Sequence, residues 1–585
     1  MINRLSQSIR EYKKDSILAP IYVSLEVLLE VVIPILMASL IDYGIDAGNL
    51  NYVIKMGVML LVFAAISLLT GALAGRSAAI ASSGFAKNLR KDMYYNVQNF
   101  SFSNIDKFST ASIVTRLTTD VTNVQNAFQM IIRMAFRAPI MLTFAMIAAF
   151  RIHAQLSLIF LVAVPVLGIG LYIIMIMAHP IFEQIFKIYD RLNSIIQENL
   201  HGVRVVKSFI REEYEEEKFM NVSDQIYQDF TKAEKILAFN MPLMQFCMYS
   251  CTLLISWFGA RLIITTGNDP VSGLSTGQLM SLIAYATQIL MSLMMLSMVF
   301  VMITISRASA ERIVEVLEEE SDLKNGAHPI YEVKDGSITF ENVSFKYYQS
   351  AEKECLKQIN LAIESGQTIG IIGGTGSSKA SLVQLIPRLY DVTKGRVTVG
   401  GVDVRDYDLE SLRQQVAMVL QKNILFSGTI KENLRWGNEQ ATDEELKRAC
   451  ELAQADDFIQ NFPDGYDTYI EQGGSNVSGG QKQRLCIARA LLKKPKILIL
   501  DDSTSAVDTK TDALIRQGFA SDIPNTTKII IAQRISSIQD ADQILVMNDG
   551  EINAIGTHDE LLKTCSIYQE VYHSQVNGGN VDETI

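Results

Sequence analysis

The stretch that decides the fold of the second half of the chain is Thr368-Ile369-Gly370-Ile371-Ile372-Gly373-Gly374-Thr375-Gly376-Ser377-Ser378-Lys379-Ala380-Ser381. Residues 368–372 form a short, mostly apolar run, which predicts a buried strand. Glycines and small hydroxyl residues follow, and they predict a loop in place of more strand. A lysine, Lys379, comes directly after this loop. A strand, a glycine-rich loop and a lysine in this order predict an α/β domain.

The loop resembles the phosphate-binding pattern G-x-x-x-x-G-K-[ST]. In that pattern, backbone N–H groups and a helix N-terminus face the phosphates, and the lysine reaches the β and γ oxygens. Two positions depart from it, since Ser378 replaces the last Gly and Ala380 replaces the hydroxyl that normally binds Mg²⁺. The residues expected to bind the nucleotide phosphates are Gly373, Gly374, Thr375, Gly376, Ser377, Ser378, Lys379, Ala380 and Ser381.

A second buried strand, Lys496-Ile497-Leu498-Ile499-Leu500, ends in Asp501-Asp502. Carboxylates at this place are expected to hold a metal and to act in catalysis. Between the loop and this strand lies Asn476-Val477-Ser478-Gly479-Gly480-Gln481-Lys482-Gln483-Arg484. The second half of the chain therefore has the components of a nucleotide-binding domain.

The first half has a different composition. Up to residue 325 the chain carries 26 basic and 27 acidic residues, and after it 26 basic and 36 acidic residues. A chain of 585 residues is also too long for one domain. We expect two domains, 1–325 and 326–575, and a flexible tail, 576–585. The net charge of −11, without a clustered Lys/Arg surface, argues against nucleic acid as a partner.

The first half is predicted to cross a membrane. It contains six segments with almost no charge, each long enough to cross the bilayer as a helix, which takes roughly 20 residues. No period-2 pattern suggests a barrel. The six segments are Ile17–Tyr43, Met56–Gly75, Phe128–Phe150, Ala154–Phe182, Ile236–Ala260 and Leu279–Ser306. Lys and Arg concentrate before the first apolar segment and in the long connections that follow the second and fourth segments. This distribution places those connections and the second domain in the cytoplasm.

Glu26 and Glu30 stand one helical turn apart inside the first of these segments, and Arg133 and Arg137 stand inside the third. Charge within a membrane usually faces a water-filled path or a partner charge. One interpretation is that Glu26 and Glu30 line a cavity that favours cationic or amphipathic cargo. The other is that they pair with Arg133 or Arg137, or lie near the membrane interface.

The order and spacing of the loop, the V-S-G-G-Q segment and the second strand resemble the ATP-binding-cassette (ABC) family, whose signature is L-S-G-G-Q. Six membrane helices fused to one cassette resemble the half-transporter layout of bacterial exporters. This resemblance implies a six-helix transmembrane domain of the type IV exporter fold. It is fused to an α/β P-loop nucleotide-binding domain with a helical subdomain, in the cell (cytoplasmic) membrane.

The resemblance also assigns residues. Tyr347 is similar to the aromatic that stacks on adenine, and Gln421 to the glutamine that touches Mg²⁺ and the attacking water; Asp501 is expected to hold Mg²⁺ with it. In this family two cassettes enclose two ATP molecules, each bound by the loop of one chain and the signature of the other. The residues expected to serve the partner's site are Ser478, Gly479, Gly480, Gln481 and Asp508.

Three of the departures from the family pattern at the chain's own site bear on hydrolysis. Asp502 stands where the hydrolytic Glu is usual, and Gln533 stands where His is usual; Ala380 is the third departure. A carboxylate withdrawn by about 1 Å can cost roughly 10²-fold in rate. Loss of one electrostatic partner can cost on the order of 10²- to 10³-fold. The chain therefore resembles the degenerate-site subunit of a heterodimeric bacterial multidrug exporter, active as an ATPase only with a partner.

Two functions follow from these observations. The first is an export subunit that moves amphipathic drugs or lipids across the bilayer with ATP and Mg²⁺, paired with a half-transporter that carries a consensus ATP site. The second is a non-transporting ABC scaffold or sensor in which ATP binding is structural.

Overall fold

The computed structural model describes residues 1–585 except 270–272, 349–351, 504 and 579–585, so most of the expected tail lies outside the described residues. The chain forms two compact units. The first unit contains Met1–Gln98 and Thr110–Glu319, and the second contains Asn99–Ser109 and Glu320–Ile585. A short stretch from the first half of the sequence, 99–109, thus belongs to the second unit.

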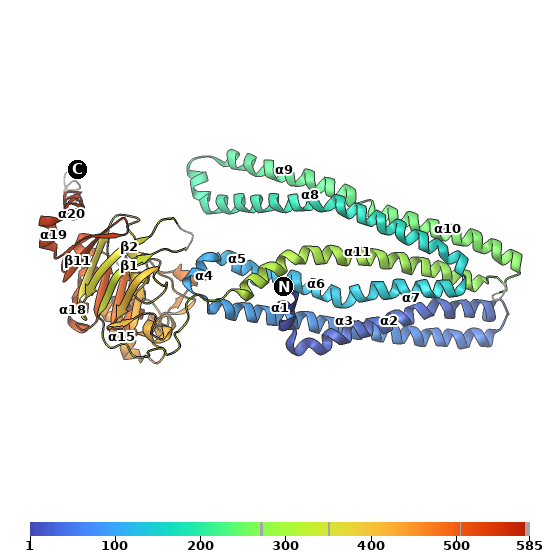
Figure 1. The fold of residues 1–585 in the computed structure, drawn as a ribbon, viewed down its shortest axis with the longest axis horizontal. Helices are drawn as coiled ribbons and strands as arrows, with labels where there is room; N and C mark the ends of the chain where they lie inside the picture. The colour runs from blue at the N-terminus through green and yellow to red at the C-terminus, as the bar shows by residue number, and fades with distance from the viewer. Residues whose placement is uncertain (270–272, 349–351, 504, 579–585) are drawn as a thin grey trace. The chain divides into compact units, whose positions relative to one another are not determined.

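The first unit is helical, and six of its long helical stretches are apolar enough to span a membrane, as the sequence predicted. Figure 1 shows α8 running antiparallel to α9 and α10, while α2, α3, α6, α7 and α11 lie side by side. The helices are α1 Ile2–Ser6, η1 Gln7–Tyr12, α2 Lys13–Leu40, η2 Ile41–Ile45, α3 Leu50–Gln98, α5 Thr110–Thr115, η3 Arg116–Asp120, α6 Val121–Met130, η4 Ile131–Ala135, α7 Phe136–Ile152, α8 Ala154–Ser208, α9 Glu212–Leu237, α10 Asn240–Thr266 and α11 Thr276–Glu318.

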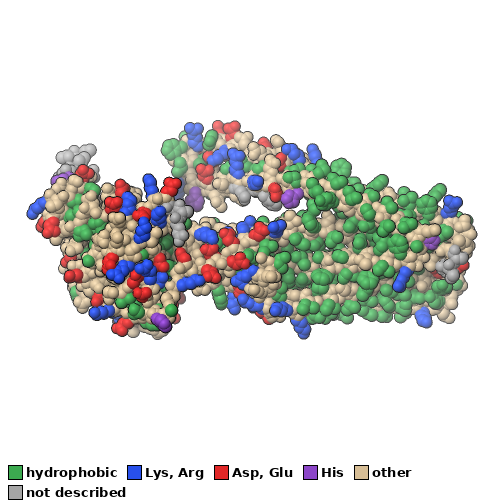
Figure 2. All heavy atoms as spheres, in the orientation of Figure 1, with side chains coloured by type: hydrophobic (Ala, Val, Ile, Leu, Met, Phe, Trp, Pro, Cys, Tyr) green, Lys and Arg blue, Asp and Glu red, His purple; other side chains and the backbone are tan. Residues whose placement is uncertain are grey.

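The apolar sections of these helices face outward. Only 6% of the most apolar window of α3 is buried, and Leu68 on that helix is 76% exposed. In water such a surface would be costly, whereas in hydrocarbon it is matched. Figure 2 shows hydrophobic side chains gathered over one end of the helices and charged side chains over the region of α8 and α9 at the other end. The apolar end is the section that lies in the bilayer.

Two of the membrane helices, α2 and α11, are joined by polar contacts. Pro34 has no N–H, so the carbonyl of Glu30 lacks its partner within α2. Gln288 Nε2 of α11 donates to that carbonyl at 3.5 Å, and the hydroxyl of Tyr285 donates to the carbonyl of Val31 at 2.5 Å. Side chains of α11 thus satisfy backbone groups of α2 where water is absent.

The second unit is an α/β domain built on a six-stranded sheet in the order β12-β11-β3-β10-β9-β6, whose inner strands are parallel. A second, antiparallel sheet has the order β2-β1-β4-β5. The strands are β1 Ile338–Phe345, β2 Leu356–Ile363, β3 Thr368–Gly373, β4 Lys394–Val399, β5 Val402–Asp403, β6 Val416–Val419, β7 Gly428–Thr429, β8 Tyr469–Ile470, β9 Ile497–Asp501, β10 Thr527–Ile531, β11 Gln543–Asn548 and β12 Glu551–Gly556.

The parallel sheet is buried on both faces, as its unbroken apolar strands require. Along β9, Ile497 and Ile499 join a core with the antiparallel sheet, whereas Leu498 and Leu500 join a core with the helical part, which includes α14, α15 and α17. The helices are α4 Phe102–Lys107, α12 Lys379–Gln384, α13 Leu409–Gln415, α14 Ile430–Arg435, α15 Asp443–Leu452, α16 Asp456–Gln460, η5 Gly465–Asp467, η6 Gln472–Gly474, α17 Gly479–Leu492, α18 Thr509–Asp522, η7 Ile535–Ser537, α19 His558–Thr564 and α20 Ser566–Gly578.

The register of the sheet brings three loops together. Strand β10 lies between β3 and β9, and Ile531 pairs with Ile371 on one side and with Asp501 on the other. Because these strands are parallel, their carboxyl ends lie at the same edge of the sheet, which is where ligands bind in such folds. The loops after Gly373, Asp501 and Ile531 therefore meet at this edge.

Candidate functional site

The loop after β3 curls around the side chain of Lys379. Its ammonium group donates to the carbonyls of Gly373 and Gly374, both at 2.8 Å, and to Ser377 Oγ at 3.1 Å. A Cβ on Gly373 would lie 2.2 Å from the carbonyl oxygen of Met547, so only glycine fits there. The loop oxygens thus fix the position of the ammonium group.

Ser378 adopts a backbone conformation that favours glycine, with φ at 67°. A residue with a Cβ pays roughly 1–2 kcal/mol for this conformation, which explains why the motif usually has Gly here. The hydroxyl of Ser378 contacts Cys355 Sγ at 3.1 Å, a contact that the sequence did not predict. The substitution is accommodated, and the loop keeps its course into α12.

Tyr347, the predicted adenine-side aromatic, lies next to the helix that follows the loop. Its hydroxyl is 2.8 Å from Ser381 Oγ and 3.3 Å from Gln384 Oε1. Burial raises the pKa of Tyr347, so its hydroxyl stays protonated. The ring is thereby fixed to α12, within the same domain as the phosphate loop.

The three predicted catalytic side chains meet at the carboxyl end of β9. Gln533 Nε2 donates to Asp502 Oδ2 at 2.7 Å, and Gln421 Nε2 lies 3.5 Å from the same oxygen. Asp502 is 9% exposed and has a φ of 48°, in the left-handed region. One oxygen of the carboxylate is thus engaged by the side chain that replaces the usual His.

Asp501, the predicted metal residue, is buried beside Asp502. Burial and the neighbouring carboxylate both raise the pKa of Asp501, while Lys379 opposes the shift. Two adjacent carboxylates are the donor chemistry that Mg²⁺ prefers, so Asp501 fits a cation brought by a nucleotide. Ala380 has no side-chain oxygen, so the hydroxyl ligand that this position usually gives to Mg²⁺ is missing, and the residues present fit the ion only in part. Among the residues that the structure describes, no group of three or more His, Cys, Asp or Glu forms a metal site.

The predicted signature residues begin α17. Ser478 Oγ accepts from the backbone N–H of Gln481 at 3.3 Å, and Gln481 Oε1 accepts from the N–H of Ser478 at 2.9 Å. This reciprocal capping leaves Ser478 and Gly479 exposed at the start of the helix. Asp508 caps α18 by accepting from the N–H of Thr511 at 3.0 Å.

A glutamine that the sequence did not single out joins these two segments. Gln483 Nε2 donates to Ser505 Oγ at 3.3 Å, and its Oε1 accepts from the N–H of Ala506 at 3.1 Å. The loop before α18 is thus tied to the signature helix. Gln575, also not predicted, fixes the Gln533 loop from α20, since its Nε2 donates to the carbonyl of Gln533 at 2.7 Å.

In the membrane unit, Arg137 of α7 contacts both glutamates of α2. Its guanidinium lies 2.8 Å from Glu26 Oε1 and 2.7 Å from Glu30 Oε2. The sequence left Arg133 and Arg137 open as partners, and Arg137 is the one that pairs. Glu26 Oε2 is buried without a hydrogen-bond partner among the described residues. Two carboxyl groups thus share one guanidinium at this place.

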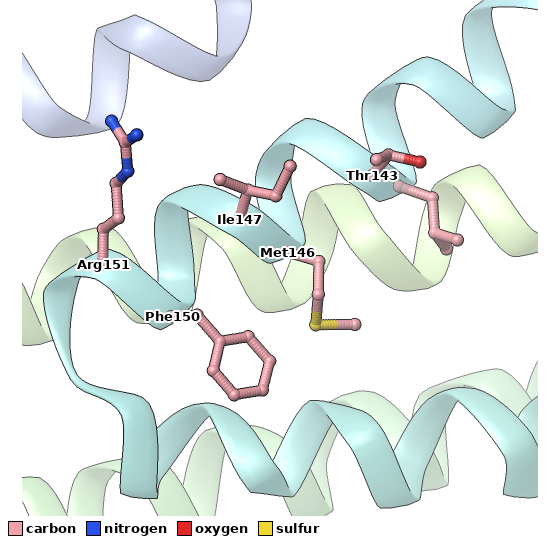
Figure 3. A pocket seen from close by; sticks show the side chains of 6 residues that line it. Thr143, Met146, Ile147, Phe150 and Arg151 are labelled. Carbon is pink, nitrogen blue, oxygen red and sulfur yellow. The ribbon is translucent and has the colours of Figure 1, made fainter.

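A hollow of about 540 Å³ in the same unit does not coincide with these glutamates. Its lining comes from a single helix, α7, and Figure 3 shows Met146, Ile147 and Phe150 on it, with Thr143 and Arg151 at its two ends. An apolar hollow on one helix of the membrane section is a surface that hydrocarbon covers.

Six apolar helices fused to a phosphate-loop α/β domain define a multi-pass membrane protein with a nucleotide-binding domain in the cytoplasm. A sequence profile described as "ABC transporter transmembrane region" matches residues 17–313, and one described as "ABC transporter" matches residues 356–505. The chain belongs to the ABC transporter family, and its cytoplasmic domain is an ABC ATPase domain that binds ATP.

Similar curated proteins cover nearly the whole chain. The uncharacterized ABC transporter ATP-binding protein YfiB of Bacillus subtilis is 38% identical over 94% of each chain. The uncharacterized ABC transporter ATP-binding protein Rv1273c of Mycobacterium tuberculosis is 34% identical over 98% of this chain and 97% of its own length. A solved structure, a bacterial Atm1-family ABC exporter with ATP bound, matches with a TM-score of 0.81 and 24% identity, over 96% of this chain and 99% of that one. That match shows the exporter fold.

As the pH is raised, Lys379 loses its proton and the affinity for ATP should fall. We expect this fall at a lower pH than for a solvent-exposed lysine, because burial lowers the pKa of Lys379. Only the protonated ammonium attracts phosphate, so binding above this pKa must first take up a proton. Equilibrium binding of a non-hydrolysable ATP analogue to the full chain, measured from about pH 7 to about pH 10, tests this. Lys379→Arg stays charged over that range and should bind with little pH dependence. The same pH dependence in both proteins would contradict the expectation.

Proposed function

We propose that this chain is one subunit of a heterodimeric ABC exporter, with a hydrolysis-impaired ATP site of its own and a competent signature for the partner's site. The observation that carries this proposal is the 2.7 Å hydrogen bond from Gln533 to Asp502. This hydrogen bond engages the carboxylate of Asp502, which is expected to activate water. Its donor, Gln533, stands where the family usually has a His that contacts the γ-phosphate.

Several features support impaired hydrolysis. Asp502 is one methylene shorter than Glu, and one of its oxygens is held by amides that donate hydrogen bonds. An oxygen that already accepts hydrogen bonds from these amides has less room to accept one from the attacking water. Ala380 removes an oxygen ligand for Mg²⁺, so Asp501 and Gln421 would hold the ion with the nucleotide phosphates. When bound, Mg²⁺ neutralises charge on those phosphates.

The remaining features support ATP binding and a functional signature. Lys379 lies within the loop, where it donates to the carbonyl of Gly373, and Tyr347 contacts the helix that follows the loop, which supports their proposed roles toward the phosphates and the adenine. Ser478 and Gly479 are exposed at the start of α17, where a second cassette could approach. A chain with a weak phosphate site and an intact signature is suited to serve a competent site on another chain.

The proposal is tested by purifying the chain alone and together with a half-transporter that has a consensus ATP site. The isolated chain should bind ATP and release almost no phosphate. The pair should hydrolyse ATP and export amphipathic dyes from cells. Robust hydrolysis by the isolated chain would overturn the impaired site. Hydrolysis by the pair without efflux of any tested drug or lipid would favour a scaffold or sensor instead.

We further propose that Glu26 and Glu30 favour cationic amphipathic cargo, because the two carboxyl groups share the one guanidinium of Arg137. Glu26→Gln should lower efflux of a cationic dye by about tenfold, the size of one lost charged hydrogen bond. Efflux of a neutral dye of similar size should change little. Glu30→Gln is the matched variant on the same helix face, and it removes the same charge. Equal loss for both dyes would show that the ion pair serves folding alone.

A further inference from the structure

A cavity of about 250 Å³ lies in the second unit, at the edge of the sheet opposite to the ATP site. Its walls come from α18, from the strands β3 and β10, and from η7 and the segment that follows it. Lys528 and Thr368 both line the cavity, and they pair with each other at the amino ends of β10 and β3. The phosphate loop follows the carboxyl end of β3, so the cavity is separate from it.

The side chain of Lys528 is a buried cation with few partners. Lys528 is 4% exposed, and within the described part of the chain its ammonium group donates one hydrogen bond, to the carbonyl of Ile523 at 3.2 Å, and forms no ion pair. An ammonium group has three donors, so two remain for a ligand or for water. Burial lowers the pKa of Lys528, while Asp542 opposes the shift. A buried charge is costly unless a partner compensates it, so this ammonium favours an anion.

The other charged groups at the cavity are already engaged. Arg516 of α18 contacts Asp540 Oδ2 through Nη1 at 2.7 Å and Asp512 Oδ2 through Nε at 3.3 Å. Asp542 Oδ2 accepts from a backbone N–H of β3 at 2.7 Å. These contacts leave Lys528 to bind an anion. Because Asp540 and Asp542 are near, they would repel a dianion such as phosphate more strongly than a single carboxylate.

The rest of the wall is largely apolar. Phe519, Ile530 and Ile538 are all buried and line the cavity, together with three alanines. Sites for drug-sized ligands have volumes of roughly 300–1,000 Å³, so this cavity is suited to a smaller molecule. Its chemistry fits a compact ligand that has one negative charge and a short apolar body.

We propose that this cavity binds a small organic carboxylate, whose charged group accepts hydrogen bonds from Lys528 and whose apolar part lies against Phe519 and Ile538. The site is distinct from the nucleotide and cargo sites of the proposed function. Its ligand would contact α18, which follows Asp508, and the segment after η7, which follows Gln533. A carboxylate bound here is therefore placed to act as an effector of both segments.

The test is binding of para-fluorobenzoate to the purified full-length chain in detergent, measured by broadening of the fluorine NMR signal. A saturating non-hydrolysable ATP analogue is present, so that the phosphate loop is occupied. The unchanged chain should broaden the signal in a saturable way, and protein-free micelles should not. The neutral para-fluorobenzamide has nearly the same shape and should bind at least about tenfold more weakly, since it lacks the charge that pairs with the ammonium.

Two variants locate the binding. Lys528→Met keeps the length of the side chain and removes its charge, so it should weaken para-fluorobenzoate binding by at least about tenfold. Ala520→Trp, at an exposed position of the lining, should block the cavity and abolish binding even if the buried change disturbs folding. Ser521→Trp is the matched control at the next exposed position, outside the lining, and should bind as the unchanged chain does.

Three results would overturn the proposal. The first is the absence of saturable broadening with the unchanged chain. The second is equal affinity for the benzoate and the benzamide. The third is unchanged binding of the benzoate in both Lys528→Met and Ala520→Trp.

Discussion

The triple variant Ala380→Ser, Asp502→Glu, Gln533→His is expected to hydrolyse ATP at least about 100-fold faster than the unchanged chain. The longer carboxylate reaches toward the attacking water, and removal of Gln533 frees the oxygen that its amide now holds at 2.7 Å. The hydroxyl introduced in place of the Ala380 methyl group adds an oxygen ligand for Mg²⁺. Phosphate release by the purified full-length chain in proteoliposomes, at saturating ATP and Mg²⁺, measures the gain.

The single variants show which contact limits the site. Asp502→Glu alone should recover only a small part of the gain, because Gln533 and Gln421 would still donate to the carboxylate and residues that act as a unit do not add. Gln533→Ala is the matched variant that removes the hydrogen bond without adding an imidazole. A triple variant that binds ATP and stays inactive would refute the view that these three positions impair hydrolysis.

The six membrane helices could be predicted because the bilayer fixes the length of an apolar helix and excludes other structures. Five of the predicted segments lie inside continuous helical stretches, which also extend beyond them, as in α3 and α8, whereas Ile236–Ala260 crosses the turn between α9 and α10. The sheet could be anticipated from the apolar runs at 368–372 and 496–500. The order of its strands could not, because pairing such as that of β3 with β11 is non-local.

The contacts within the site could not be predicted from the sequence, because they too join residues that are far apart in the chain. Asp502 and Gln533 were both predicted as site residues, yet the bond between them depends on the register of β9 and β10. The choice of Arg137 over Arg133 as the partner of Glu26 follows from the rotation of α7 against α2, which periodicity does not specify.

Gly479→Ala in this chain is expected to lower ATP hydrolysis by the assembled pair by about 10²- to 10³-fold, the usual cost of one lost electrostatic donor to the reacting phosphate. Folding should not suffer, because the added Cβ would meet only the methyl group of Ala506 at 3.6 Å, an ordinary contact. Alanine also suits the first turn of α17 better than glycine. The methyl group would instead obstruct the exposed surface that the γ-phosphate on the partner must approach.

The matched control for this variant is Asp502→Asn, which neutralises the carboxylate at the chain's own site. It should leave turnover by the pair within about twofold of normal, the scatter of a substitution away from the reacting groups. Initial rates of phosphate release by both variants, in pairs purified at equal stoichiometry, decide the matter. If Asp502→Asn abolished turnover and Gly479→Ala spared it, hydrolysis would take place at this chain's own phosphate loop, and the two sites would have to be exchanged in their roles.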